Sequence, residues 1–517
     1  MGHHREQGRL DTAYDAVAYP GYAYARTHPD RLATQAVLFG LQPTPIDSCR
    51  VLEIGCGDGG NLVPMALDLP GSEFVGIDLA AQPVARGAAL ADELGLTNVE
   101  LRALDVQALP DDLGEFDYIV AHGLYSWIAP EPRDALMAAC GRHLAPQGVA
   151  FVSYNAYPGS YLRDMARDVL LFHVSKLDDP ALRVGQARAL MELVVDAQAD
   201  TPYARVLREH MERLLDHRDW ALYHDDLAAV NTPVYFHEFV EHAGRHGLQF
   251  LAESELAESQ LPGVPDHVAA ALEQLPDDVV VREQYMDFVR NRMFRQTLLC
   301  RAEAAPRRTI GPEVLAGLWI ASPVRPAEQV DGEAVTFHGP RGSAMETADP
   351  LLQRTLSILG QFWPQAVAFE DLVERSRQAI VSPRAPAEDR RRLAEVLLRA
   401  AAGSLVHLHT HPPTVARRAG ERPAASPLAR RQAAAGDQVV TTLRHGSVRI
   451  DDPLAAFLLT RLDGTRDRAG LLADLSAFVD DGGLDPEAGV SPPPEDELPG
   501  ALDQALDRLA ELALLRG

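Results

Sequence analysis

Residues 50–61 read RVLEIGCGDGGN, a short apolar run that ends in a glycine-rich turn. The apolar part has the length and composition of a buried strand. Gly55, Gly57 and Gly59 lack a Cβ atom, so a ligand can lie against the backbone N–H groups of this turn. A strand, a glycine turn and then a helix are typical of an α/β domain that binds its ligand at the carboxyl ends of parallel strands.

Four more apolar runs follow within the next hundred residues. Helix-like segments separate them, for example QPVARGAALADELG at 82–95. Buried strands that alternate with helices predict parallel βαβ units, and therefore a Rossmann-like α/β core. The runs are EFVGIDLA at 73–80, VELRALDV at 99–106, FDYIVAHG at 116–123 and GVAFVSY at 148–154.

Three acids accompany these strands. Glu53 precedes the glycine turn, where a carboxylate repels a pyrophosphate but pairs well with an ammonium group. Asp78 ends the second run, where an acid can accept hydrogen bonds from both hydroxyls of a ribose. Asp105 ends the third and could meet an adenine amino group. Either aspartate alone would favour a strand-end cap in solvent, but together with the turn they resemble the class I S-adenosylmethionine-dependent methyltransferases.

Two later loops carry the candidate catalytic residues. AHGLYSWIAPEP, at 121–132, follows the fourth strand and contains His122, Tyr125 and Trp127. Aromatic faces stabilise a sulfonium or alkylammonium cation, and His122 could accept the proton of an amine or hydroxyl. Tyr154 and Asn155 end the fifth strand, and Asn155 could orient an amine. Ordinary packing, or a turn role for Asn155, is the alternative reading.

The remaining chain reads as further domains. Residues 161–310 are mostly amphipathic helices, including the segment 284–299. The segment 447–475 resembles small winged-helix modules that bind an extended peptide by strand addition, although a plain packing role is equally open. We expect an N-terminal arm or lid at 1–35, a cofactor-binding core at 36–160, a helical regulatory domain at 161–321, a linker at 322–348 and a winged-helix-like α+β domain at 349–517.

Composition narrows the class of protein. The 517 residues carry a formal net charge of −26, which disfavours nucleic acid as a partner and favours a basic one. No stretch has the length of a membrane span or a signal peptide, and the four cysteines lack disulfide or metal spacing, so we expect a cytoplasmic protein.

We also expect no metal site. His237 and His242 in HEFVEH lie five residues apart, which puts them on different helix faces. His407, His409 and His411 alternate along a strand, where an exposed strand face is the favoured reading over a metal site.

Several segments resemble one family. YDAVAYP at 14–20, THPDRL at 27–32, YIVAHGLYSW at 118–127 and the long motif at 224–256 are similar to bacterial methyltransferases that carry a methyltransferase regulatory domain. The best-known members of this family methylate lysines of outer-membrane proteins and dimerise through the helical middle domain. We expect cofactor contacts from Tyr14, Tyr19, Glu53, Gly55, Cys56, Gly57, Asp58, Asn61, Asp78, Leu79, Asp105, Val106 and His122.

The resemblance implies a function and leaves alternatives. We predict an S-adenosylmethionine-dependent N-methyltransferase that acts on a protein or peptide, at lysine, by in-line transfer to a neutral amine, and that releases S-adenosylhomocysteine. The resemblance also implies a homodimer through residues 161–321. One alternative is a small-molecule or natural-product N- or O-methyltransferase, and another is a cofactor-binding scaffold without catalysis.

Overall fold

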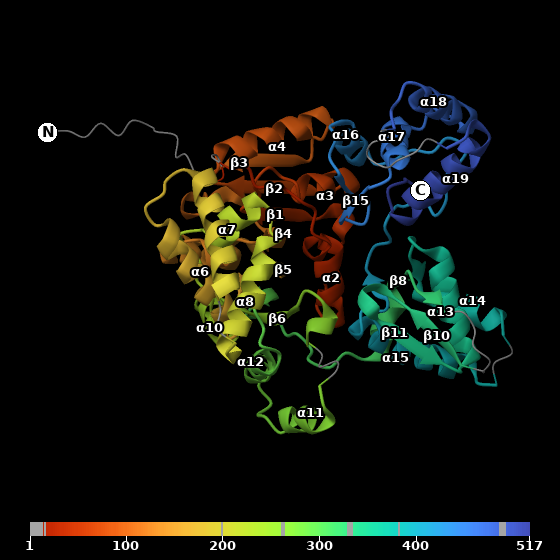
Figure 1. The fold of residues 1–517 in the computed structure, drawn as a ribbon. Helices are drawn as coiled ribbons and strands as arrows, with labels where there is room; N and C mark the ends of the chain where they lie inside the picture. Colours follow the sequence, from red (N-terminus) through yellow and green to blue (C-terminus); the bar gives the residue numbers. More distant parts are fainter. Residues whose placement is uncertain are drawn as a thin grey trace.

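The computed structural model describes residue 14 and residues 17–197, 200–259, 264–327, 334–380, 383–484 and 493–517. Most of the first half of the expected arm, residues 1–13, 15 and 16, therefore lies outside the described residues. In the described part a Rossmann-like α/β core is followed by helical and α+β units (Figure 1).

The core is one seven-stranded sheet in the order β3-β2-β1-β4-β5-β7-β6. β1 to β5 run parallel to one another, while β7 runs antiparallel to both β5 and β6. The predicted α/β core is confirmed. The strands are β1 Arg50–Ile54, β2 Glu73–Asp78, β3 Val99–Ala103, β4 Phe116–Ala121, β5 Leu144–Asn155, β6 Leu248–Glu253 and β7 Phe294–Arg301.

β6 and β7 correct the sequence analysis, which expected mostly amphipathic helices in this region and no strand at 284–299. The segment 284–299 divides: α12 (Val279–Arg290) ends at Asn291, whose φ of 49° is left-handed, and β7 begins three residues later. Phe294 to Leu299 then pair with β5. Pairing with a buried strand outweighs the local helix pattern, because it satisfies the backbone of an apolar segment inside the core.

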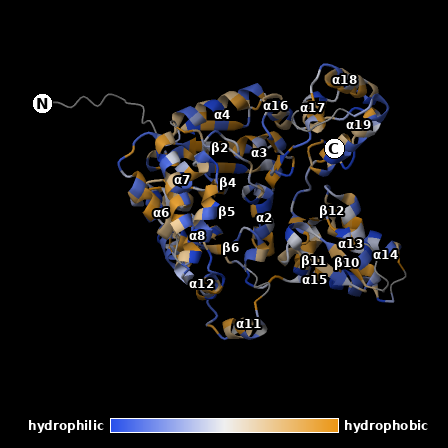
Figure 2. Cartoon of the chain, viewed as in Figure 1, coloured by the Kyte–Doolittle hydropathy of each residue, from blue (hydrophilic) through white to orange (hydrophobic). Residues whose placement is uncertain are grey.

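Side chains alternate between two buried layers. Val51 and Tyr118 belong to the cluster that packs against α2 and α3, whereas Leu52 and Ile119 belong to the one that packs against α5 and α10. α4 and α6 alternate between hydrophobic and hydrophilic residues in Figure 2, as expected for helices with one solvent face. The helices around the sheet are α2 Pro29–Leu38, α3 Leu62–Asp68, α4 Ala81–Glu93, α5 Pro130–His143 and α10 Phe236–Arg245.

A helical unit covers one end of the core. Its apolar cluster includes Leu170, Met191, Met211 and Leu222. None of the helices in the described residues combines the length and hydropathy that crossing a membrane requires. The helices of this region are α6 Ser160–Val174, α7 Pro180–Ala197, α8 Pro202–Leu215, α9 Asp219–Ala221 and, further along, α11 Asp266–Glu273; a π-helical turn, η6, spans Leu222–Asp226.

The C-terminal third forms two units with separate apolar clusters (Figure 1). The first extends the cluster of the catalytic core, and the second packs within residues 425–515. Their helices are α13 Pro350–Phe362, α14 Phe369–Gln378, α15 Pro386–Ala402, α16 Pro427–Ala434, α17 Pro453–Arg461, α18 Arg468–Asp480 and α19 Leu498–Glu511; their strands are β8 Trp319–Ala321, β9 Arg325–Pro326, β10 Val335–His338, β11 Ala344–Thr347, β12 Val367–Ala368, β13 His407–His409, β14 Val439–Thr441 and β15 Ser447–Arg449.

Two expectations about this third were wrong. The expected linker at 322–348 contains β9, β10 and β11, which pair into an antiparallel sheet. The expected exposed face of β13 is also corrected, because His409 is buried and its Nδ1 lies 2.7 Å from Oδ2 of Asp30. Asp30 also accepts hydrogen bonds from the backbone N–H groups of Thr410 and His411, so α2 and β13 are held together.

Candidate functional site

A cavity of about 480 Å³ opens at the carboxyl ends of β1, β2 and β4. All thirteen residues that the sequence predicts as cofactor contacts line it. They come from the N-terminal arm, the turn after β1, the end of β2, the loop after β3 and the loop after β4. The sheet topology therefore brings these segments together around one cavity, as expected for a parallel sheet whose strands end at the same edge.

The glycine turn has the conformation that its sequence suggested. Gly55, Gly57 and Gly59 have φ values of 81°, 54° and 72°, a left-handed region that is costly for other residues. At Gly57 a Cβ would meet nothing within 4 Å, so its backbone faces open space at the cavity. At Gly60 a Cβ would lie 2.5 Å from the carbonyl carbon of Gly21, so the arm packs directly on the turn.

Glu53 lies buried beneath the turn with one carboxylate oxygen unpaired. Its Oε1 accepts a hydrogen bond from Nδ2 of Asn61 at 2.7 Å, while Oε2 has no hydrogen-bond partner among the described residues. Burial raises the pKa of Glu53 to about 8, against the opposing effect of the Asn61 hydrogen bond. A buried acceptor without a partner is costly, so an ammonium group of a ligand fits this position.

Asp78 and Asp105 combine structural and site-lining positions. The carboxylate of Asp78 accepts hydrogen bonds from the backbone N–H groups of Gly57 at 2.9 Å and Ala80 at 2.8 Å, which fixes it at the end of β2. Asp105 caps the following turn by accepting from the N–H of Gln107 at 2.9 Å. Both aspartates also line the cavity, so each side chain caps a backbone segment and also faces the space for a ligand.

His122 lines the cavity in its neutral form. Its Nδ1 lies 3.0 Å from Oγ of Ser153, and its ring centroid lies 4.2 Å from that of Tyr24. Burial, and secondarily the charge of Arg26, lower the pKa of His122 to about 4. The imidazole is therefore uncharged near neutral pH and a weak base, which disfavours the possibility that His122 accepts the proton of the acceptor.

Trp127 is the other catalytic candidate that lines the cavity. The guanidinium carbons of Arg163 and Arg167 lie 5.2 and 5.8 Å from its ring centroid, which is the range of cation–π contacts. Two arginines of α6 therefore contact the indole that lines the cavity.

The three other catalytic candidates lie away from the cavity. Tyr125, Tyr154 and Asn155 are buried and are not among the described residues that line it. The hydroxyl of Tyr125 lies 2.9 Å from Nδ1 of His242, and Tyr154 stacks on Phe239 at 4.0 Å. Asn155 donates from Nδ2 to Oδ1 of Asn231. Strand alternation explains Tyr154, because its side chain falls on the core face of β5.

The sequence analysis missed Asp225. It lies in η6, lines the cavity, and has its pKa raised to about 6 by burial. Its neighbour Asp226 is instead paired with Arg163 at 3.0 Å. The available signal was the motif HDD at 224–226, whose adjacent acids are also typical of the start of a helix. A π-helical turn is a frequent mark of a functional site.

The N-terminal arm lines the cavity beside Asp225. Tyr14 stacks on His224 with ring centroids 4.5 Å apart, and Tyr19 packs against Trp220 at 4.8 Å. Both tyrosines line the cavity beside Asp225. The expected lid is therefore an aromatic arm anchored on the segment that follows α8, as far as the described residues extend.

Asn61 connects the turn to a distant part of the chain. Its Oδ1 accepts from the N–H of Tyr24 at 3.0 Å and the hydroxyl of Thr27 at 3.0 Å, and it lies 2.9 Å from Nε2 of His445. His445 is buried between β14 and β15 with a left-handed φ of 53°. One amide thus links the C-terminal unit to the carboxylate of Glu53.

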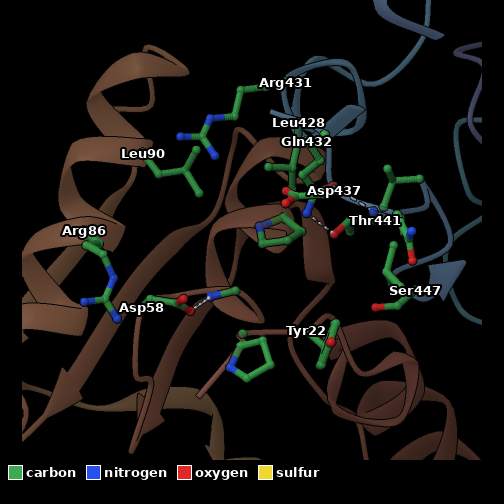
Figure 3. Close-up of a pocket in the computed structure, with 18 of the residues that line it drawn as sticks. Tyr22, Asp58, Arg86, Leu90, Leu428, Arg431, Gln432, Asp437, Thr441 and Ser447 are labelled. Atoms are coloured by element: carbon green, nitrogen blue, oxygen red, sulfur yellow. Dashed lines mark hydrogen bonds between the residues drawn. The ribbon is translucent and has the colours of Figure 1, made fainter. Parts of the chain in front are cut away.

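A second, more polar cleft of about 690 Å³ adjoins the first (Figure 3). It lies between α4, which contributes Arg86 and Leu90, and the α16–β14 region, which contributes Leu428 and Gln432. Its floor is shared with the first cavity: Pro20, Gly21, Tyr22, Asp58 and Gly60 line both. The arm therefore separates the two spaces.

Three family models match the chain. A methyltransferase domain matches residues 51–148, a domain described as "Predicted methyltransferase regulatory domain" matches 218–301, and a "PKMT, C-terminal winged helix domain" matches 421–514. The last match places the winged-helix domain in the second of the two C-terminal units.

The similar proteins match between about half and nearly all of this chain. The protein RP789 of Rickettsia prowazekii is 34% identical over 374 residues, which is 70% of this chain and 68% of the relative. RP028 of the same organism is 35% identical over 241 residues, 46% of this chain and 96% of the relative. The structure of PKMT2 from Rickettsia typhi, also solved in complex with AdoHcy, is 26% identical, with a TM-score of 0.86 over 96% of this chain and 100% of that one.

The cavity and the comparisons agree on the cofactor. The unpaired carboxylate oxygen of Glu53, the open backbone at Gly57 and the aspartates after β2 and β3 suit the amino group, the chain and the nucleoside of S-adenosylmethionine. The chain belongs to the family of S-adenosylmethionine-dependent methyltransferases that join a methyltransferase domain, a methyltransferase regulatory domain and a PKMT winged-helix domain.

Proposed function

We propose that the protein transfers a methyl group from S-adenosylmethionine to the side-chain amine of lysine in a protein or peptide. The observation that carries the proposal is the wall of the cofactor cavity, where Asp225 lies among Tyr14, Tyr19 and Trp127. An acid among aromatic faces matches an alkylammonium side chain in charge and in shape. The PKMT winged-helix match and the similarity to PKMT2 support the same class of acceptor.

The residues of the cavity have separate tasks in this proposal. The thirteen lining residues predicted from the sequence hold the cofactor, with Glu53 on its ammonium group and Asp78 on its ribose. When bound, S-adenosylmethionine supplies a methyl group that is activated by the positive sulfur. Trp127 and the arm tyrosines exclude water and orient the amine, so that transfer requires mainly placement.

Proton handling follows from two pKa values. Asp225, with its pKa raised to about 6, is ionised near neutral pH and accepts an N–H of the incoming ammonium at its carboxylate. The ammonium must lose a proton to water before it has a free lone pair, and a higher pH favours this loss. His122, with its pKa lowered to about 4, adds no positive charge beside the sulfur. Activity is therefore expected to rise with pH.

The test measures transfer of a labelled methyl group to three acceptors. They are a lysine-rich peptide, the same peptide dimethylated at its lysines beforehand, and a cell metabolite extract. Label on the unmodified peptide supports the proposal, and it is identified as methyl-lysine by mass spectrometry. Lys176 is the single lysine of the chain, so self-labelling is recognised at one position. Label confined to metabolites would replace the proposal with a small-molecule activity.

Asp225→Asn separates binding of the amine from binding of the cofactor. It is expected to reduce transfer to the peptide while the affinity for S-adenosylhomocysteine stays unchanged. Asp219→Asn is the matched control, because Asp219 is an exposed acid in the same stretch whose partner is Arg188. Equal transfer by the two variants would remove Asp225 from the acceptor site.

We also propose that the helical unit supports a homodimer. Phe172 and Tyr203 are each 84% exposed, and Leu193 is 63% exposed. Large apolar side chains on neighbouring helices are typical of a surface that another subunit covers. Tyr203→Arg is expected to lower the mass measured by light scattering; a wild-type mass equal to one chain would contradict the proposal.

A further inference from the structure

Outside the cofactor cavity, α5 and α10 bring together three side chains with metal-ligand chemistry. His242 lies in α10, His246 directly follows it, and Asp134 lies in α5. Oδ1 of Asp134 lies 3.1 Å from Nε2 of His242 and 2.8 Å from Nε2 of His246. The three ligand atoms all lie within 4.8 Å of one another.

The spacing explains why the sequence analysis rejected a site here. It paired His237 with His242, which are five residues apart. The structure pairs His242 with His246, four residues apart and on one face, and supplies an acid more than a hundred residues earlier in the chain. Ligands of one zinc ion at about 2.0–2.2 Å lie roughly 3.3 Å apart in tetrahedral geometry. The two distances from Asp134, 3.1 and 2.8 Å, are close to that value, and the two Nε2 atoms lie within 4.8 Å of each other.

The surroundings favour coordination in two further ways. Nδ1 of His242 lies 2.9 Å from the hydroxyl of Tyr125, a partner that orients the ring and leaves Nε2 directed at the cluster. The side chain of Asp134 is 59% exposed, so water can reach a fourth position. Two imidazoles, a carboxylate and a water form a donor set that zinc and similar ions accept.

We propose that Asp134, His242 and His246 bind one divalent transition-metal ion. The ion joins α5 of the methyltransferase domain to α10 of the region matched by the regulatory domain. It also sets the direction of one hydrogen bond: with Nε2 on the metal, Nδ1 of His242 carries the proton and donates it to Tyr125. Tyr125 precedes Trp127 in the turn that lines the cofactor cavity, so the ion steadies this turn.

The proposal predicts metal uptake that depends on the three ligands. Purified full-length protein without an added histidine tag is stripped with chelator and titrated with Zn²⁺ against a competing chromophoric chelator. We expect tight binding of one ion that His246→Ala and Asp134→Ala each weaken at least tenfold. Tyr125→Phe is expected to weaken it by about 10- to 100-fold, the usual effect of removing a partner of a ligating histidine.

His237→Ala is the matched control, because His237 lies in the same helix and contacts Gln284 instead of the cluster. His3 and His4 remain in every variant, so weak binding there cancels in the comparison. Co²⁺ provides a second readout, since a four-coordinate site gives intense visible absorption that His246→Ala abolishes. Absence of uptake by the wild type, or equal affinity of His246→Ala and His237→Ala, would overturn the proposal, and circular dichroism verifies that each variant is folded.

Discussion

The buried acid beneath the glycine turn predicts that cofactor binding releases a proton. In the free protein burial raises the pKa of Glu53 to about 8, so its carboxyl group is about 90% protonated at pH 7. A ligand ammonium beside Oε2 favours the carboxylate form and expels this proton. Binding at pH 7 should therefore release close to one proton per chain.

The same linkage fixes the sign and size of the pH dependence. The ionised fraction of Glu53 rises from about 1% at pH 6 to about 50% at pH 8, so affinity should rise about fifty-fold over this range. S-adenosylhomocysteine is the suitable ligand because it keeps the ammonium group and is not consumed. Isothermal titration calorimetry in buffers of different ionisation enthalpy measures the number of protons released directly.

Glu53→Gln is the control, since the amide keeps the shape and an acceptor oxygen but has no titrating proton. Its proton release should fall toward zero, and its affinity should vary little between pH 6 and pH 8. Asp225, with its pKa raised to about 6, titrates near this range and remains in both proteins. Identical pH profiles for the wild type and Glu53→Gln would refute the assignment of the ammonium position.

Three further predictions concern other parts of the structure. His445→Ala removes a donor from Asn61 and should weaken binding of S-adenosylhomocysteine about five-fold in calorimetry, the effect of a net hydrogen bond of about 1 kcal/mol. The KM for a lysine peptide should fall as pH rises through about 6, because Asp225 becomes ionised, and Asp225→Asn should lose this dependence. Arg295→Met should lower the free energy of unfolding in urea by about 3–5 kcal/mol, because buried carboxylates of Glu253 and Asp287 lose their partner.

For each of these three predictions, a specific result would contradict it. His445→Gln retains a donor and should bind nearly as well as the wild type; equal weakening by both substitutions would point to packing instead. A KM independent of pH between 5 and 7 would exclude Asp225 from amine binding. Arg282→Met is the control for Arg295, since Arg282 is half exposed and pairs with an exposed acid, and it should change stability by less than about 1 kcal/mol.

Local patterns were enough to predict the cofactor cavity. The glycine turn requires φ values that glycine adopts easily, and its acids lie at strand ends, so both signals are contained in a few adjacent residues. The structure accordingly brings every predicted cofactor residue to one space. The catalytic predictions were weaker because they depended on which face of a strand each side chain takes. Tyr154 has its ring in the core, although it lies at the end of β5, next to the last strand residue.

By itself the sequence determined the parallel core and its ligand-binding turn, because these follow from short-range periodicity and the stereochemistry of glycine. The class of cofactor followed from the resemblance of this turn and its acids to a known family. Only the tertiary structure decided that Phe294–Arg301 is a strand, that Asp225 lines the cavity, and that His445 reaches Asn61 across 384 residues. The physical reason is that packing and hydrogen bonding between distant segments depend on how the chain closes on itself. No local propensity carries that information.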